Sequence, residues 1–492
     1  MRKSGVLMPI TSLPSPYGIG CFSIEAYRFI DFLAKAGQSC WQILPLGPTG
    51  YGDSPYQSFS TFAGNPYFID FGDLIERGWL TTQDCDRYDF GKDHEKVDYE
   101  KIYRSRFKVL EVAYRNSRIG EQYNYQEFVR RNADWLEDYV LYMAIKDSLE
   151  GISWLEWEDQ LRLREPGRLQ SCREEFWQEM DFYRFQQFMF NEQWTRIKRY
   201  ANEKGIKIVG DIPIYVALDS SDAWANPELF QFDDNSRPIA VAGCPPDGFS
   251  ADGQLWGNPL YRWEYHSSTN YQWWIKRLAY SFKWYDIVRI DHFRGFESYY
   301  VIPFGDKTAR NGHWVKGPDY PFFAAINREL GDREIIAEDL GFLTPEVYSM
   351  VQKTGYPGMK ILQFAFDSRE ESDYLPHNYQ HNCVVYTGTH DNDTTMNWFK
   401  MMADDDKKFC SDYLNLEKVR RKDLHWEFIR AALASVADLA VIPLPDYLGL
   451  GRSGRINTPS TLGGNWLWRL EPGVLTDELA ERIRLMTQLY KR

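Results

Sequence analysis

The sequence lacks any framework of paired cysteines. Its seven cysteines are odd in number and scattered from Cys21 to Cys410, and no Cys-x-x-Cys motif occurs. A disulfide-stabilised secreted fold needs paired cysteines, and a zinc site needs closely spaced ones. We therefore interpret the cysteines as reduced, small apolar side chains, and expect neither a disulfide framework nor a zinc site.

Long apolar runs and an excess of positive charge are also missing. Residues 5–10 are too short for the core of a signal peptide, and residues 431–444 are too short to span a bilayer and contain Asp438. The formal net charge of -13 disfavours nucleic acid and anionic membranes as partners, because both are bound through basic surfaces. We expect a cytoplasmic protein with no nucleic-acid or membrane partner and an uncharged substrate.

Several catalytic motifs are absent, whereas aromatic residues are abundant. The sequence contains no Walker phosphate loop, no Gly-x-Ser-x-Gly elbow and no Cys/His nucleophile arrangement. Aromatic residues make up 16% of the chain, with 18 Trp and 32 Tyr. Most of these rings are expected in the core, but a groove lined by some of them would suit a sugar, whose C–H faces stack on rings while its hydroxyls form hydrogen bonds.

Short apolar runs alternate with helical segments along the whole chain. The expected strands cover residues 7–14, 41–46, 206–214, 287–291, 334–338, 361–366, 383–387 and 439–444. A helical pattern over residues 24–36 separates the first two runs, as in a parallel βαβ unit. The pattern predicts one catalytic (β/α)8 barrel over residues 1–492, with its active site at the carboxyl ends of the strands.

Two long segments interrupt this pattern. Residues 47–205 are far longer than an ordinary βα connection, become helical from about Tyr99, and predict an inserted loop followed by an α-helical subdomain. An aromatic stripe near its end is expected to serve packing. Residues 243–259 are rich in Gly and Pro, carry an exposed-looking Trp256, and predict an irregular loop that acts as an active-site lid.

The strand at residues 287–291 carries charges that a buried strand should avoid. Side chains two apart on a strand share a face, so Arg289 and Asp291 are expected to project together. A neighbouring cation lowers the pKa of a carboxyl and keeps it ionised, as a carboxylate nucleophile requires. The alternative, left open by this stretch alone, is a buried ion pair that only stabilises the fold.

Two further acids follow other expected strands. Glu338 emerges from the apolar residues 335–337, which should raise its pKa and keep it protonated. Asp391 follows the strand at 383–387 within a His390-Asp391-Asn392-Asp393 run, which offers donors and acceptors for sugar hydroxyls. One ionised and one protonated carboxyl, about 5 Å apart, is the arrangement of retaining glycoside chemistry.

Eight short motifs together resemble one family. They are SLPSPYG (12–18), GDSPYQ (52–57), GDIPI (210–214), RIDHFRG (289–295), AEDLG (337–341), THDN (389–392), NTP (457–459) and GNW (464–466). Across nearly the whole chain, the sequence resembles the 4-α-glucanotransferases called amylomaltases or disproportionating enzymes, which are related to α-amylases. That resemblance implies a helical insertion after the second strand and no C-terminal β-domain, for which the chain leaves no room after the eighth strand.

The resemblance also implies roles for particular residues. Asp291 would be the nucleophile, Glu338 the general acid/base and Asp391 the stabiliser of the transition state. The expected substrate-binding residues are Ser54, Tyr56, Asp211, Gln254, Trp256, Arg289, His292, His390 and Asn465. The family uses neither a metal nor an organic cofactor, so none is expected here. Maltooligosaccharides would be both donor and acceptor, and the sequence predicts no particular oligomeric state.

The predicted function is therefore the transfer of α-1,4-glucan segments between maltodextrins with retention of configuration. One alternative is an α-amylase-type hydrolase, which would use the same acids but pass the intermediate to water. A second alternative is a non-catalytic carbohydrate-binding protein. The second is disfavoured because a binding protein does not need a buried, charge-matched set of acids.

Overall fold

The core of the molecule is a parallel eight-stranded barrel. The computed structural model describes residues 2–50, 52–246, 251–341 and 343–492. The barrel strands are β1 (Lys3–Leu7), β2 (Cys40–Gln42), β3 (Lys207–Pro213), β6 (Ile287–Asp291), β9 (Ile335–Ala337), β10 (Gly358–Ile361), β11 (Cys383–Tyr386) and β12 (Leu439–Pro443). Neighbouring strands follow the order β10-β11-β12-β1-β2-β3-β6-β9, and the Ala337 N–H donates to the Pro357 carbonyl at 2.9 Å where β9 meets β10. The predicted (β/α)8 fold is confirmed.

Two strands lie earlier in the chain than the apolar pattern predicts. β1 ends at Leu7, where the expected strand begins, and β10 ends at Ile361, where its expected strand begins. In both places burial continues past the strand, because Met8 and Leu362 are fully buried in the turns that follow. An apolar run therefore marks burial here without marking extended backbone.

Helices on the outside of the barrel present their apolar faces to it. In α1 (Ile24–Lys35), Ala26, Phe29, Ile30 and Leu33 recur at helical spacing and are buried. The other longer helices that follow strands are α11 (Gln272–Trp284), α12 (Tyr320–Leu330), α13 (Pro345–Thr354), α14 (Thr395–Met401), α15 (Asp404–Leu414), α16 (Leu424–Ala434) and α18 (Asp477–Leu489). Short helices α9 (Ser221–Ala225), α10 (Trp263–Ser268) and α17 (Leu444–Tyr447) complete the connections.

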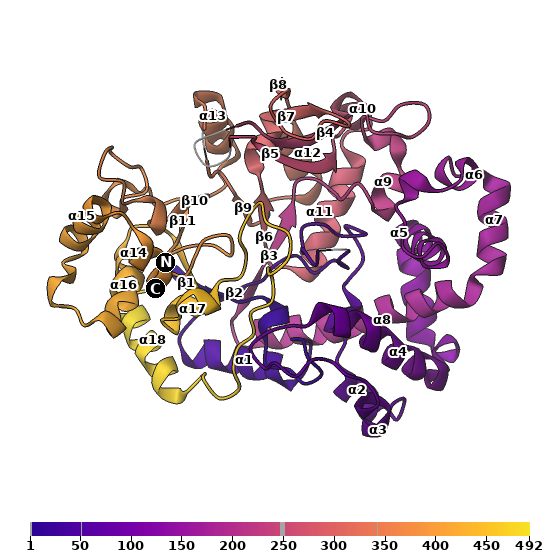
Figure 1. Cartoon of the computed structure of the whole chain (residues 1–492), viewed down its shortest axis with the longest axis horizontal. Helices are drawn as coiled ribbons and strands as arrows, with labels where there is room; N and C mark the ends of the chain where they lie inside the picture. Colours follow the sequence, from indigo (N-terminus) through magenta and orange to yellow (C-terminus); the bar gives the residue numbers. More distant parts are fainter. Residues whose placement is uncertain (1, 51, 247–250, 342) are drawn as a thin grey trace.

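The segment between β2 and β3 begins as a long loop and continues as helices. The helices are α2 (Phe71–Glu76), α3 (Thr82–Asp86), α4 (Tyr99–Ser117), α5 (Tyr123–Ser148), α6 (Asp159–Arg162), α7 (Pro166–Glu175) and α8 (Trp177–Glu203). They gather on one flank of the barrel (Figure 1). On α8, the aromatic stripe that includes Tyr183, Phe190 and Trp194 is buried, so the expectation that it serves packing is confirmed.

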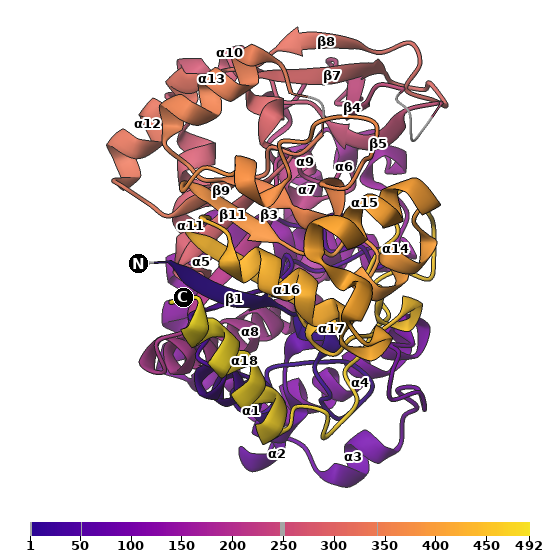
Figure 2. The ribbon, with the colours of Figure 1, turned by 90° about the vertical axis from the view of Figure 1, so that its left-hand side faces the viewer.

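A second, antiparallel sheet was not predicted. Its strands β4 (Ala240–Cys244), β5 (Gln254–Pro259), β7 (Ser298–Pro303) and β8 (His313–Lys316) are joined in the order β5-β4-β7-β8. The irregular loop expected at residues 243–259 is thus wrong in part, because β4 and β5 pair with each other; residues 247–250 lie outside the described residues. The sheet lies beside α10 and α12, above the carboxyl end of β6 (Figures 1 and 2).

The two ends of the chain meet beside the amino ends of β1 and β12. The Arg492 guanidinium donates to the carbonyls of Lys3 and Ala437 at 3.0 and 2.9 Å, and both termini lie close together in Figures 1 and 2. In the described part of the chain, no helix combines the length and the apolar character needed to cross a membrane.

Candidate active site

Strands β3 and β6 place a cluster of charged side chains at the carboxyl end of the barrel, in which Asp211 and Arg289 are buried and Asp291 is partly exposed. Their register places Asp211 beside Arg289. The Arg289 Nη1 lies 2.7 Å from both carboxylate oxygens of Asp211 and 3.0 Å from Oδ1 of Asp291. Arg289 and Asp291 therefore share a face, as the strand pattern predicts, and a single cation bridges two acids.

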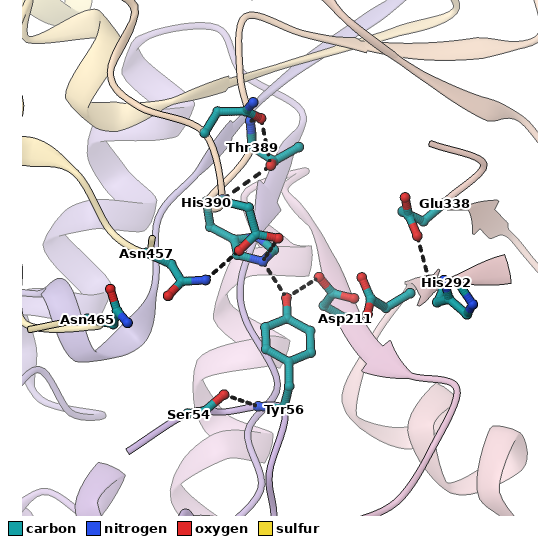
Figure 3. A network of polar contacts seen from close by, with 12 residues as sticks. Ser54, Tyr56, Asp211, His292, Glu338, Thr389, His390, Asn457 and Asn465 are labelled. Atoms are coloured by element: carbon teal, nitrogen blue, oxygen red, sulfur yellow. Dashed lines mark hydrogen bonds and ion pairs between the residues drawn. The ribbon is translucent and has the colours of Figure 1, made fainter. Parts of the chain in front are cut away.

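Tyr56 connects this cluster to the loop after β11. Its hydroxyl donates to Oδ2 of Asp211 at 2.9 Å and lies 2.9 Å from Nε2 of His390 (Figure 3). Because the hydroxyl proton is directed at Asp211, the His390 Nε2–H is the donor in the second contact. The two rings stack at 5.3 Å, and Trp466 packs against both.

Asp391 is held by two polar neighbours. Its Oδ2 lies 3.3 Å from Nε2 of His390, and its Oδ1 accepts a hydrogen bond from Nδ2 of Asn457 at 2.6 Å. Burial alone would raise its pKa, but His390, Asn457 and Arg289 outweigh burial and lower it to about 2. Asp391 is therefore ionised at neutral pH. The same contact raises the pKa of His390 above its ordinary value.

Glu338 directly follows β9 and lies in a different environment. Its Oε2 accepts from the backbone N–H of His292 at 2.6 Å (Figure 3). Its Oε1 accepts from the backbone N–H of Leu340 at 3.1 Å. Burial, followed by the charge of Asp291, raises its pKa well above the usual value, against the opposing effect of Arg289. The predicted direction is confirmed, and Glu338 is the protonated member of the pair.

The expected effect of Arg289 on Asp291 is outweighed. The sequence predicts a lowered pKa for Asp291, but burial raises it to about 6, with Arg289 opposing and Asp211 and Asp391 adding to the rise. The prediction is wrong in direction because the sequence reveals the neighbouring cation and not the depth of burial or the nearby acids. Asp291 remains the more acidic partner of Glu338, so it is mostly ionised at pH 7.

Gln254 and Trp256 of β5 lie beside His292. Its backbone has a left-handed φ of 54°, and its ring meets that of Trp256 edge to face at 4.7 Å. The Trp256 Nε1 donates to Oε1 of Gln254 at 3.1 Å. Burial lowers the pKa of His292 to about 3, so its ring is neutral at pH 7. Trp256 is partly buried against these residues and is not the exposed ring that the sequence suggests.

Two expected binding residues support loops. Ser54 Oγ accepts from the Tyr56 N–H at 3.3 Å, which closes the turn that presents Tyr56. Asn465 accepts from the Thr458 N–H at 2.9 Å and donates to the Thr461 carbonyl at 3.1 Å. In Figure 3 no dashed contact joins Asn465 to the other residues drawn. Its polar groups thus hold the loop at 458–465 together.

Sequence reasoning gave no role to two residues that hold the loop carrying His390 and Asp391. Asn457 stands in the NTP motif, but nothing in the sequence pairs it with Asp391, 66 residues away. Asp446 is buried after β12 and accepts from the hydroxyls of Thr387 and Thr395 at 2.5 and 2.7 Å, so both ends of the loop are fixed. Within the described ranges, no three His, Cys, Asp or Glu side chains form a group suited to a metal ion.

Comparisons with known proteins agree over the full length. The sequence model of the 4-alpha-glucanotransferase family matches residues 8–476. The chain is 48% identical over 487 residues to the 4-alpha-glucanotransferase of Clostridium butyricum, covering 99% of this chain and 100% of that protein. It is 50% identical over 494 residues to that of Streptococcus pneumoniae, covering 100% and 97%.

A solved structure gives the same result. The amylomaltase from Streptococcus agalactiae in complex with acarbose superimposes with a TM-score of 0.97 at 40% identity, and all of both chains is covered. Full-length identity at this level, together with the barrel and its cluster of carboxyls, shows that this chain belongs to the 4-alpha-glucanotransferase family.

Proposed function

We propose that Asp291, Glu338 and Asp391 carry out the reaction of this 4-alpha-glucanotransferase. The observation that carries the proposal is the pair of neighbouring carboxyls, since the pKa of Asp291 is about 6 and burial raises that of Glu338 well above its usual value. A retaining enzyme needs one carboxylate and one carboxylic acid at the same pH. Near neutrality this pair provides both.

In the first step, the Asp291 carboxylate attacks the anomeric carbon of the donor glucan. The bond from that carbon to the glycosidic oxygen breaks, and the Glu338 proton passes to the leaving oxygen, which releases the shortened glucan. In the second step, the 4-hydroxyl of an acceptor glucan attacks the same carbon and gives its proton to Glu338. The ester bond to Asp291 breaks, and two inversions yield net retention.

The ion cluster would stabilise the positive charge that develops on the sugar in the transition state of each step. Asp391, with a pKa of about 2, remains ionised throughout, and its negative charge attracts the positive charge of an oxocarbenium-like transition state and so stabilises it. Asp211, Tyr56 and His390 form a connected polar edge that can bind the hydroxyls of the donor sugar. Because these groups already hold one another in place, little reorganisation is needed when the sugar binds.

The acceptor must outcompete water, which is present at about 55 M. An oriented, bound acceptor can reach effective molarities of about 10⁵ M or more, provided that the site excludes water. We assign this covering role to residues 243–259 as a lid, with Trp256 packed on His292. Tyr56 packs elsewhere, on His390 and Trp466, so the lid and the Tyr56 loop (residues 47–70) would cover different parts of the glucan.

The proposal also covers the domain bounds, the substrates and the compartment of the enzyme. We propose one catalytic barrel over residues 1–492, an insertion at 47–205, and α-1,4-linked maltooligosaccharides as donor and acceptor. Residues Ser54, Gln254 and Asn465 would contribute from the rim of the site. We place the enzyme in the cytoplasm, supported by six buried free thiols, at Cys21, Cys40, Cys85, Cys172, Cys383 and Cys410.

Products formed from pure maltotriose test the function. We expect glucose and a ladder of longer maltodextrins, while the total number of reducing ends stays nearly constant, because each transfer conserves glycosidic bonds. Chromatography of the products and a reducing-end assay measure the two quantities in one sample. A steady rise in reducing ends, with no product longer than maltotriose, would establish hydrolysis and overturn transfer; no reaction at all would favour a binding protein.

A further inference from the structure

Gln187 of α8 binds the backbone of the Tyr56 loop at two points. Its Oε1 accepts from the Gly64 N–H at 2.7 Å, and its Nε2 donates to the Gly64 carbonyl at 2.9 Å. The Gln187 residue is only 2% exposed, so water does not replace these bonds easily. Gly64 also packs directly against α8, because the Cβ of any other residue at this position would lie 2.2 Å from Cδ1 of Phe190.

Residues after β3 and in α5 hold the loop closer to Tyr56. Asp222 is 4% exposed, and its Oδ2 accepts from the Thr61 N–H at 2.7 Å. The backbone N–H and the hydroxyl of Ser221 both donate to the Phe59 carbonyl, at 2.8 and 3.1 Å. The Lys146 ammonium lies 5.2 Å from the centre of the Phe59 ring. The loop is thus held at Phe59, Thr61 and Gly64 by contacts with α5, α8 and α9.

These contacts reach Tyr56 through a closed turn. Thr49 and Ser58 form an antiparallel bridge, and the Phe59 N–H donates to the Pro48 carbonyl at 3.0 Å. Ser58 Oγ lies within hydrogen-bond distance of the carbonyls of Pro48 and Ser60, at 2.9 and 2.8 Å, and its single proton can bond either one. A displacement at residues 59–64 therefore moves both arms of the turn that carries Tyr56.

We infer that Gln187 and Asp222 are positioning residues for Tyr56, and that the helical insertion (α4 to α8) supports the catalytic cluster through Gln187. The inference rests on the proposed function. The Tyr56 hydroxyl has to lie within hydrogen-bond distance of Asp211 and His390 at once, at 2.9 Å from each. A misplacement of about 1 Å breaks both contacts, and misplacements of that size cost up to about 100-fold in rate.

The helix supplies its own control. Gln193 is also 2% exposed on α8, and its side chain also pairs with both backbone groups of one loop residue, Asp70, at 2.7 and 3.3 Å. Asp70 lies at the far end of the loop, where it caps α2. The variants Gln187→Leu and Gln193→Leu therefore each remove a pair of bonds to one loop residue, at different distances from Tyr56, and Gln193→Leu also removes a bond to Oδ2 of Asp73 at 3.0 Å.

We expect Gln187→Leu to lower kcat/KM for transfer from maltotriose by about 10- to 100-fold, and Gln193→Leu by less than about threefold, both measured where circular dichroism shows folded protein. In a Tyr56→Phe background, Gln187→Leu should have little further effect, because its influence passes through the lost hydroxyl. Equal losses in the two leucine variants, or a loss that multiplies fully with that of Tyr56→Phe, would overturn the inference.

A second pair of variants covers the case in which Gln187→Leu does not fold. Asp222→Asn keeps an oxygen that can accept from the Thr61 N–H, whereas Asp222→Ala does not. We expect Asp222→Asn to retain most of the activity and Asp222→Ala to lose about tenfold or more. Equal impairment of both would overturn the inference. Absence of transfer by the unaltered enzyme would instead overturn the proposed function.

Discussion

The two carboxyl groups on either side of Asp291 have pKa values that are shifted in opposite directions. On one side, Asp391 is bonded to His390 and Asn457, and its pKa falls to about 2. On the other side, Glu338 receives two backbone N–H groups but no side-chain cation of its own, and its pKa rises well above the usual value. The neighbours, and not the type of residue, set the protonation of these acids.

The difference also separates the tasks of the two sides. The side of Asp391 is charged and internally bonded, which suits a fixed electrostatic environment. On the side of Glu338 lies a neutral His292, whose ring packs against Trp256, and such uncharged surroundings suit a group that must hold a proton and give it up. Asp291 lies between them, with a pKa of about 6. Four substitutions test this division.

Asp291→Asn should have the largest effect. An amide cannot form the glycosyl ester, so we expect turnover to fall by about 10⁴-fold or more while the fold is retained. Steady-state transfer from maltotriose and a thermal unfolding curve measure the two properties. Retention of more than a few per cent of the activity by a contaminant-free preparation would remove Asp291 from the role of nucleophile.

Glu338→Gln removes the proton donor and leaves the nucleophile. We expect turnover of maltotriose to fall by about 10²- to 10⁴-fold. A glycosyl fluoride donor needs no proton on its leaving group, so its first step should survive and the ester on Asp291 should accumulate. Mass spectrometry of a proteolytic digest detects that ester. If no adduct forms, the assignments of Asp291 and Glu338 are both in doubt.

Asn457→Ala weakens the charged side alone. A hydrogen bond to an ionised group is worth about 1.5–3 kcal/mol, so we expect turnover to fall by roughly 10- to 100-fold. The pKa of Asp391 should rise from about 2, yet the acidic limb of the pH profile should stay near pH 6, because Asp291 sets it. Asn202→Ala is the matched control, since Asn202 Nδ2 also donates to a carboxylate, Oδ2 of Asp286 at 2.8 Å, before the amino ends of β3 and β6. A shift of the acidic limb would show that Asp391 was not the more acidic group.

Trp256→Ala should have the smallest effect on rate at neutral pH and a specific effect on the pH profile. Without the indole, water reaches His292 and Glu338, so the pKa of Glu338 should fall. Because Glu338 must be protonated for the first step, the alkaline limb should move to lower pH, and the ratio of hydrolysis to transfer should rise. Trp314→Ala, in β8 of the same sheet, is the control. If the alkaline limb does not move, Trp256 does not influence the pKa of Glu338.

Much of the barrel could be predicted, and the reason is visible in β6. Residues 287–291 form a strand within the predicted bounds, because β-branched residues dominate them and the following turn is distinct. The small sheet could not be predicted in the same way. β4 consists of Ala, Val, Gly and Cys and runs into a Gly- and Pro-rich segment, and its strand character depends on pairing with β5 and β7.

The site was predictable in residue type and less so in energetics. Arg289 and Asp291 share a face because side chains in a strand alternate with a period of two, and this spacing can be read directly from the sequence. The pKa of Asp291 depends on burial and on acids from other strands, and Asp211 lies 80 positions earlier in the chain. The bond from Asn457 to Asp391 likewise depends on two loops that only the closed barrel brings together.

The pairing of β1 with β12 has a consequence for the synthesis of the protein. Lys3 pairs with Leu439, so β1 finds one of its two neighbours only after the residues up to β12 have been made. At about 5–20 residues per second, that delay is roughly 20 to 90 s. During this time one edge of β1 is unpaired, and such edges promote aggregation. Barrel closure must therefore wait for the synthesis of β12, and newly made chains should be sensitive to chaperone supply until then.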